Sequence, residues 1–199
     1  MSSSTHLDRL IAALQILPGV GRRSATRIAF SLLDRRRDEA RRLAAVLCEA
    51  MDGVRLCSRC RNYADGELCA ICASASRSDS GLLCVTETPA DVQAIEHGGA
   101  YQGLYFVLHG HLSPIDGIGP EELGLTELAA ILGSGQVQEL ILATNPTLEG
   151  EATASYIATL ARPLGLRISR LASGIPLGGE LDGLDDQTIA ASLQHRRLI

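Results

Sequence analysis

The chain has 199 residues, of which 46% are hydrophobic, and a mean hydropathy of +0.13, so it can bury a real core in one large domain or two small ones. No apolar run approaches the length of a membrane span, and the start Met-Ser-Ser-Ser lacks a secretory hydrophobic region. We therefore expect a soluble, cytoplasmic protein that neither spans nor binds a membrane.

The net charge of −5 hides an asymmetry along the chain, whose 18 basic residues are all arginine. Residues 1–77 carry 13 arginines against 8 acidic residues, a net of +5, and residues 78–199 carry 5 against 15, a net of −10. A basic front half on an acidic protein indicates a local site for a polyanion, although a solvated helical surface explains the arginines equally well. Since only 3% of residues are aromatic and Trp is absent, contact with phosphates is favoured over stacking on bases.

Two helical patterns near the N-terminus are separated by a tight turn. The first runs to about Leu17, and Pro18 ends it. Gly19 and Gly21 permit the turn, and Ser24 can cap the helix that follows. The backbone N–H groups of such a turn and of the next helix's first turn point outward, which suits a phosphate.

The stretch Leu17–Gly21, followed by arginines, resembles the helix-hairpin-helix motif, which grips the DNA backbone without reading sequence. On this resemblance the DNA-binding residues are Gly19, Gly21, Arg22, Arg23 and Arg27. The alternative is a structural hairpin whose arginines are merely solvated. One hairpin makes few phosphate contacts, so useful affinity requires several copies and hence a homo-oligomer.

A third helix is expected after the arginine-rich stretch 35–42. Its apolar face comprises Leu43, Val46, Leu47, Ala50 and Val54. Cys48 lies off this face, with no His or thiol partner nearby, and is predicted to be a packed free thiol.

Two Cys-x-x-Cys pairs stand eight residues apart, and their members are Cys57, Cys60, Cys69 and Cys72. Pairs this close can enclose one tetrahedral ion, and the polar residues between them cannot build a core. Disulfides are the alternative, but without a secretion signal we favour one structural Zn²⁺ per chain. Four protein ligands leave no open position for chemistry. Because composition changes across this segment, we also expect it to act as a hinge.

After a Ser-rich linker at 73–80, the chain alternates strands and helices. Apolar runs predict strands at 82–86, 104–108, 140–143 and 166–171, with Cys84 as buried filler in the first. Helices are expected at 89–97, 126–132, 151–161 and 186–193. This alternation predicts an α/β domain with a parallel sheet, preceded by an all-α domain and a small zinc finger.

Polar residues follow two of these strands, where ligands bind in such sheets. Glu87 follows the first strand, and the third is followed by Asn145, Thr147, Glu149 and Glu151. The pattern resembles the Toprim domain, in which a Glu and an Asp-x-Asp hold Mg²⁺ for phosphoryl chemistry. Here the two aspartate positions are the neutral Asn145 and Thr147, which should weaken a magnesium site greatly. We expect a degenerate site in which the remaining acids dock a basic partner.

The sequence gives little support for a second metal site, a nucleotide-binding loop or a catalytic nucleophile. His109 and His111 share one long turn, 109–120, and are interpreted as polar loop residues in preference to a second metal site. No phosphate-loop sequence or recognisable nucleophile motif is present.

Taken in order, these motifs resemble the RecR family of bacterial recombination mediators along nearly the whole chain. The resemblance divides the chain into a helix-hairpin-helix domain (1–55), a zinc finger (56–79), a Toprim domain (80–175) and a C-terminal segment in oligomer contacts (176–199). It implies a non-enzymatic DNA clamp, a dimer or tetrameric ring near the nucleoid, that binds single- and double-stranded DNA without sequence preference. With RecO, and in some cases RecF, such a clamp loads RecA onto single-stranded gaps coated with SSB.

A second hypothesis is a Toprim enzyme that cleaves or joins phosphodiesters with Mg²⁺. The two hypotheses differ at Asn145 and Thr147, and incubation of the protein with labelled DNA and Mg²⁺ or Mn²⁺ distinguishes them.

Overall fold

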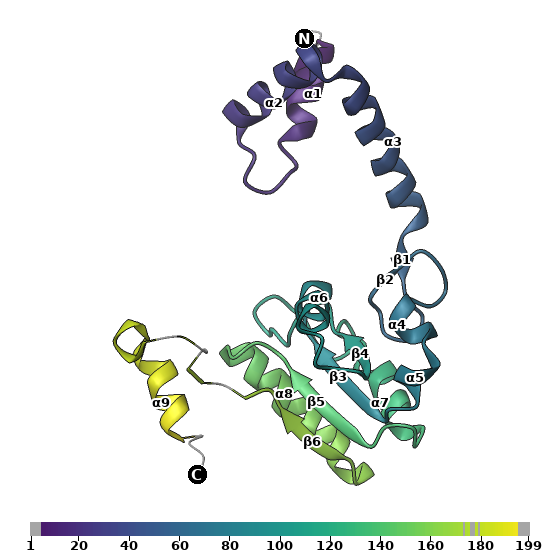
Figure 1. Cartoon of the computed structure of the whole chain (residues 1–199), viewed down its shortest axis with the longest axis vertical. Coiled ribbons are helices and arrows are strands. Elements are labelled where there is room, and N and C mark those ends of the chain that lie inside the picture. The colour runs from purple at the N-terminus through teal and green to yellow at the C-terminus, as the bar shows by residue number, and fades with distance from the viewer. Residues whose placement is uncertain (1–4, 173, 176–177, 179, 195–199) are drawn as a thin grey trace. The chain divides into compact units, whose positions relative to one another are not determined.

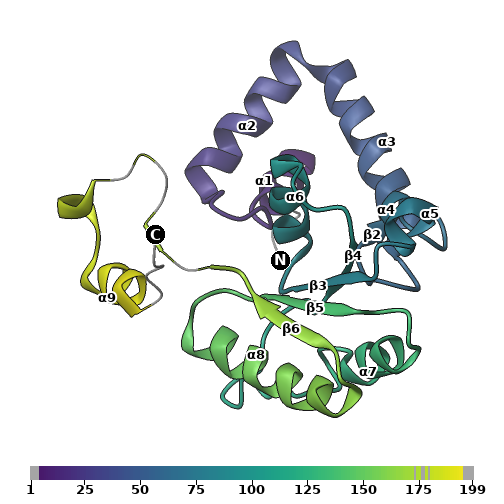
Figure 2. The ribbon, with the colours of Figure 1, turned by 60° about the horizontal axis from the view of Figure 1, so that its bottom comes forward.

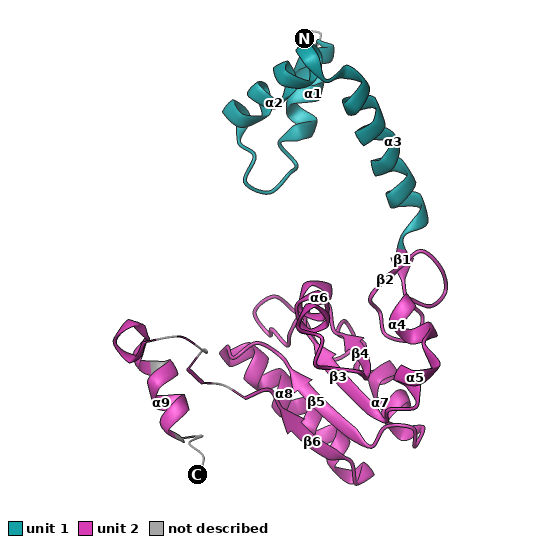
Figure 3. Cartoon of the chain, viewed as in Figure 1, with its two compact units in different colours: residues 1–54 teal, residues 55–199 magenta. Residues whose placement is uncertain are grey.

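A computed structural model of the chain describes residues 5–172, 174–175, 178 and 180–194 (Figure 1). The chain divides into two compact units, residues 1–54 and 55–199 (Figure 3). In the described part of the chain, none of the helices has the length and apolar character needed to cross a membrane.

The first unit consists of three helices, α1 (His6–Leu14), α2 (Arg22–Arg35) and α3 (Arg37–Gly53). The side chains of Thr5 and Asp8 form a capping box that starts α1. α1 ends at Leu14, three residues before the expected Leu17, because short-range hydrogen bonds such as that from the Leu17 N–H to the Leu14 carbonyl tighten the chain into turns. Ala25 and Ala29 of α2 are fully buried, and these small side chains let the helices pack closely.

The apolar face of α3 is not covered by the first unit. No residue of α3 is buried, and Met51 is 75% exposed. Cys48 is also exposed, so the prediction of a packed thiol is wrong. The helix pattern is confirmed, but burial requires an element that covers the apolar face, and the contacts of α3 with α2 leave that face exposed.

The second unit opens with the cysteine segment and continues into an α/β domain. Its first elements are β1 (Arg55–Leu56), β2 (Tyr63–Ala64), α4 (Ala70–Ala73) and α5 (Ala75–Ser78). The sheet strands are β3 (Leu82–Thr86), β4 (Leu104–Val107), β5 (Glu139–Ala143) and β6 (Arg167–Arg170). The larger helices are α6 (Pro89–Gly98), α7 (Leu125–Gly133) and α8 (Leu148–Ala161). They are followed by two short 3-10 helices, η1 (Arg162–Leu164) and η2 (Leu181–Gly183), and by α9 (Asp186–Gln194).

The four sheet strands are all parallel, as the sequence predicted, and the structure places them in the order β4-β3-β5-β6. α7 and α8 cover one face of the sheet and α6 covers the other (Figure 2). Cys84 is buried with Val92 of α6 on the second face, which confirms its role as filler. The register places Val85 beside Phe106 and Leu142, so the ends of β3 and β5 meet at one edge of the sheet.

The Ser-rich stretch 73–80 that was expected to be a linker contains the end of α4 and all of α5, and it is fastened to α6. Both terminal nitrogens of Arg77 donate to the Glu96 carboxylate at 2.7 Å, and the Tyr105 hydroxyl donates to the same carboxylate at 2.7 Å. The hydrogen bonds from Arg77 are the main cause that lowers the pKa of Glu96. Polar composition indicates a loop, but it cannot show a bidentate ion pair with a residue 19 positions away.

Candidate functional site

The four cysteines of the two Cys-x-x-Cys pairs converge on one point. Their sulfur atoms all lie within 4.8 Å of one another, and all four side chains are buried. The sequence brings them together through two local turns. The Arg61 N–H donates to the Cys57 carbonyl at 2.9 Å, and α4 begins directly after Cys69. All six cysteines of the chain are free thiols.

The pKa values of these thiols indicate that all four can ionise only when a cation is bound. Burial opposes ionisation of the Cys57 thiol, but backbone N–H donors, chiefly that of Cys69, outweigh it and lower its pKa to about 7. A hydrogen bond with Cys72, together with burial, raises the pKa of Cys60 well above its usual range. Four buried thiols this close cannot all ionise unless a cation balances them, and the thiolate is the form that binds zinc. The donor set therefore fits one tetrahedral Zn²⁺ with no open position.

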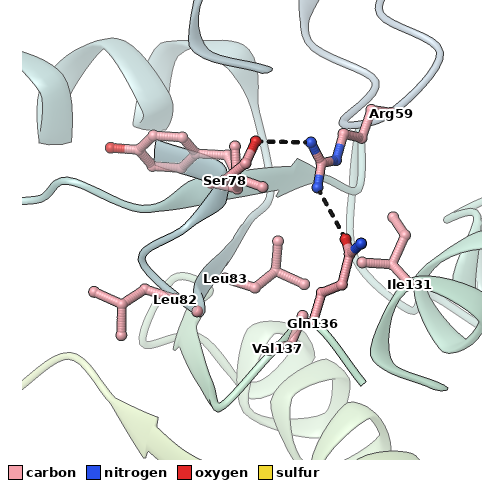
Figure 4. Close-up of a pocket in the computed structure, with 10 residues that line it drawn as sticks. Arg59, Ser78, Leu82, Leu83, Ile131, Gln136 and Val137 are labelled. Atoms are coloured by element: carbon pink, nitrogen blue, oxygen red, sulfur yellow. Dashed lines mark hydrogen bonds between the residues drawn. The ribbon is translucent and has the colours of Figure 1, made fainter. Parts of the chain in front are cut away.

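The cysteine segment is packed on the α/β domain and is not the hinge that we expected. The Val107 N–H of β4 donates to the Cys60 carbonyl at 2.9 Å. Arg59 donates to the Ser78 hydroxyl at 3.0 Å and to the Gln136 side-chain oxygen at 3.4 Å (Figure 4). The boundary between the compact units falls just before this segment, between residues 54 and 55.

A small cavity lies beside Arg59, lined by apolar side chains such as Leu83 and Ile131 (Figure 4). Its volume of about 20 Å³ holds roughly one water molecule, so it is not a ligand site.

The hairpin of the first unit has the geometry expected for phosphate contact. Gly19 has φ of +77°, a conformation that favours glycine, whereas Gly21 is extended and forms the N-cap of α2. Ser24 lies inside α2 and does not cap it, so no described side chain bonds the first N–H groups of this helix. The three candidate arginines of α2 are exposed and take part in none of the ion pairs found among the described residues: Arg22, Arg23 and Arg27.

At the edge of the sheet, Glu87 is buried and bonded to the turn after β5. One carboxylate oxygen accepts from the Asn145 N–H at 2.8 Å, and the other accepts from the Asn145 side-chain amide at 2.7 Å. A Cβ at Gly150 would lie 2.1 Å from the Asn145 carbonyl oxygen, so only glycine lets α8 begin so close to this pair. Asn145 thus donates hydrogen bonds to both oxygens of the carboxylate that a metal would need as a ligand.

The other residues of the expected acidic site lie on the first turn of α8. Thr147 is the N-cap of α8, where its hydroxyl accepts from the Gly150 N–H at 3.1 Å. Glu149 and Glu151 are exposed, and Glu151 forms an ion pair with Arg170 of β6. Apart from the cysteines, no set of three or more His, Cys, Asp or Glu ligand atoms converges in the described part of the chain. The acids that we expected to cluster are therefore separated into one buried and two exposed groups.

Comparison with known protein families matches four segments of this chain. Family models match residues 7–51 as the RecR helix-hairpin-helix, 54–74 as the RecR four-cysteine zinc finger domain, 81–172 as a Toprim domain and 174–197 as the RecR C-terminal region. The chain belongs to the RecR family. The cysteine cluster is thus a four-cysteine zinc finger for one structural Zn²⁺, and the helix-hairpin-helix indicates DNA binding.

Membership of the RecR family implies a role in recombination and repair, in a group whose members are generally non-catalytic mediators despite the Toprim domain. The predicted fold class is confirmed: N-terminal helices, a zinc finger and a Toprim domain with a four-stranded parallel sheet.

Three further residues contribute to this site, and the sequence did not predict their roles. Arg170 neutralises Glu151, and it could have been found because it ends the fourth strand at the same edge of the sheet. The Nδ1 atom of His111 lies 3.6 Å from Glu87 Oε2, which its place in a long turn did not indicate. Gly150 gave no signal beyond its position between two glutamates.

Proposed function

We propose that this RecR-family chain is a non-enzymatic recombination mediator in the cytoplasm, associated with the nucleoid. As an oligomeric clamp on DNA it acts with RecO, and in some cases RecF, to load RecA onto single-stranded gaps coated with SSB. The observation that carries the proposal is the combination of hairpin arginines outside the described ion pairs with a Toprim edge whose buried glutamate is already bonded by Asn145. RecA filament formation on SSB-coated gapped DNA, with and without the protein and RecO, tests it directly.

Magnesium-dependent cleavage is the less favoured function on this geometry. Both carboxylate oxygens of Glu87 accept hydrogen bonds from Asn145, and Glu151 is paired with Arg170. Two-metal phosphoryl chemistry needs several free carboxylates on one point. If the protein cleaves or joins labelled DNA in the presence of Mg²⁺, and Glu87→Ala abolishes this activity, the protein is an enzyme instead.

For DNA binding, we expect Arg23→Ala to weaken affinity to a similar degree on all sequences. Each lost phosphate contact should lower the slope of log affinity against log salt by about one, because one fewer counterion is released. Arg41→Ala is the matched control, since Arg41 already pairs with Asp38 at 2.8 Å. Binding titrations at several salt concentrations measure both. A loss of affinity confined to some sequences would mean that Arg23 reads bases.

For assembly, we expect a homo-oligomer in which a second copy of the chain covers the exposed face of α3. The face carries Leu43, Val46, Leu47 and Met51, each more than half exposed in its own unit. Leu47→Asp should shift the mass in solution to a smaller species and weaken DNA binding, because fewer hairpins then act together. A wild-type chain that is monomeric at micromolar concentration and still binds duplex tightly would contradict this expectation. The C-terminal segment 176–199 is proposed to contribute further contacts between copies.

For partner docking, we expect Glu149→Lys to weaken binding to RecO while zinc content and melting temperature stay unchanged. Glu149 is exposed on the first turn of α8 and enters none of the ion pairs among the described residues, whereas charge reversal at Glu151 would repel Arg170. Glu127→Lys is the control, because Glu127 lies likewise in the first turn of a helix, α7. Equal RecO affinity for both variants would remove Glu149 from the docking surface. Charges at the rim of an interface act mainly on the association rate, and salt screens them. The loss of RecO affinity in Glu149→Lys should therefore be smaller at high salt.

A further inference from the structure

Two residues with an unusual backbone meet where the zinc finger touches the Toprim domain. Arg61 has φ of +62° and His109 has φ of +60°, and they are the only non-glycine residues with positive φ in the described part of the chain. The Nε2 atom of His109 lies 2.6 Å from the Arg61 carbonyl oxygen, so this nitrogen carries the proton and donates. Left-handed backbone at such residues persists only where the surrounding structure enforces it. Here each residue supports the other.

The Arg61 side chain reaches a second point, far along the chain from His109. Its Nη2 donates to the Glu122 carbonyl at 3.1 Å, and its guanidinium carbon lies 5.8 Å from the centre of the Phe106 ring. Its Nη1 atom is buried and has no hydrogen-bond partner among the described residues. A Cβ at Gly124 would lie 1.8 Å from this nitrogen, so glycine at 124 makes room for the guanidinium.

Arg61 therefore holds both ends of one segment, residues 109–124, which we call the insert loop. Within it, the Gly110 N–H donates to the Glu87 carbonyl at 3.0 Å, and His111 lies beside the Glu87 carboxylate. The Leu112 N–H donates to the Thr153 hydroxyl of α8 at 2.9 Å. The loop is thus fastened to the same edge of the sheet at which α8 begins, with Glu149 in its first turn.

The backbone of Arg61 belongs to the zinc finger. Its N–H donates to the carbonyl of Cys57, and it directly follows Cys60. A bound Zn²⁺ fixes this turn by holding both cysteines, since the binding energy of a structural zinc is also folding energy. Once the ion is lost, nothing in the local sequence favours a left-handed arginine.

We propose that Arg61 is a positioning residue that transmits zinc occupancy to the insert loop, so that the loop and the first turn of α8 are set for a protein partner only while zinc is bound. The docking part of this proposal rests on the proposed function. The zinc finger is then a control element for the Toprim surface in addition to a fold support.

The test uses the full chain and a matched pair of variants, Arg61→Asn and Arg59→Asn. Asn tolerates left-handed backbone and lacks the guanidinium, and Arg59 contacts Ser78 and Gln136 outside the insert loop. Hydrogen exchange of loop amides such as Leu112 and Ile118, with zinc content measured in parallel, is the readout. We expect exchange about tenfold faster in Arg61→Asn with one zinc retained, and unchanged loop exchange in Arg59→Asn. Unchanged loop exchange in Arg61→Asn overturns the proposal.

Gly124→Ala tests the same contact from the loop side and leaves the zinc turn chemically intact, which covers the case that Arg61→Asn loses its ion. Because Gly124 has φ of +67°, Ala there also strains the backbone, so the deciding comparison is the effect of Gly124→Ala in the wild type against its effect in Arg61→Asn. Gly124→Ala should also accelerate loop exchange. The acceleration in the double variant should be smaller than the product of the accelerations in the two single variants, because both substitutions disturb the contact between Arg61 and residue 124. Multiplicative effects would overturn the coupling. Chelation of zinc from the wild type should accelerate loop exchange at least as much as Arg61→Asn does, because loss of the ion releases the Arg61 turn and also destabilises the zinc finger.

Binding to RecO distinguishes the positioning role of Arg61 from the docking surface on α8. Faster loop exchange with weaker RecO binding supports both the positioning role and the docking surface. Faster exchange with unchanged RecO binding keeps the positioning role and refutes the docking surface of the proposed function. Unchanged exchange in both Arg61→Asn and Gly124→Ala refutes the positioning role, whatever Glu149→Lys does.

Discussion

Cys60→Ser is expected to lose the zinc ion and to lower the free energy of unfolding by at least about 4 kcal/mol, because structural zinc contributes roughly 10–16 kcal/mol of apparent binding energy that is also folding energy. The Cys60 side chain is only 2% exposed, and its carbonyl accepts the Val107 N–H of β4, so the loss should spread into the sheet. Elemental analysis and thermal melting measure the two effects.

Cys48→Ser is the control for this variant, because Cys48 is exposed and lies outside the cluster. It should keep one zinc per chain and the wild-type melting temperature. A Cys60→Ser protein with one zinc and an unchanged melting temperature would contradict the assignment, and so would freshly purified wild type without zinc. Because hydrogen bonding and burial raise the pKa of Cys60, and burial raises that of Cys69, zinc must displace those protons, so its affinity should fall as the pH is lowered.

Asn145→Asp is expected to destabilise the protein without divalent metal and to make its stability depend on Mg²⁺. The substitution replaces an amide that donates to Glu87 at 2.7 Å with a second carboxylate at the same place. Two carboxylates so close in a buried site cannot both ionise without a cation, and we expect a loss of about 3 kcal/mol. That corresponds to roughly 6–12 °C in melting temperature for a chain of this size.

Mg²⁺ should restore much of this loss in Asn145→Asp and leave the melting temperature of the wild type unchanged. Asn145→Ala is the control: it removes the donor without adding a charge, so Mg²⁺ should not rescue it. Thr147→Asp can be added because Asp also serves as an N-cap, and the double variant should bind Mg²⁺ more tightly in calorimetry. A melting temperature of Asn145→Asp that does not respond to Mg²⁺ would refute this account of the edge.

The neutral residues at this edge show where prediction from sequence ends. That Asn145 and Thr147 replace carboxylates is visible in the chain itself, and it argues against a magnesium site. Their positive roles are not visible there. Asn145 bonds a glutamate 58 positions earlier, and Thr147 caps α8, which starts three residues before the expected Glu151 because Thr147 supplies the cap.

By itself, the sequence determined the features that depend on short-range spacing. The two Cys-x-x-Cys pairs predicted the zinc finger, the glycines after Pro18 predicted the hairpin, and the apolar runs predicted β3 to β6 to within one residue at either end. Local periodicity and turn chemistry carry this information because neighbouring residues share one backbone conformation.

Only the tertiary structure decided which faces and charges find partners. It left the apolar face of α3 and the Cys48 thiol exposed, fastened Arg77 to Glu96, buried Glu87 against Asn145, and set Arg61 of the zinc finger against both ends of the insert loop. Each of these depends on residues that topology brings together from distant parts of the chain. A periodic pattern states that a face is apolar or charged, but the element that covers it is chosen by how the whole chain packs.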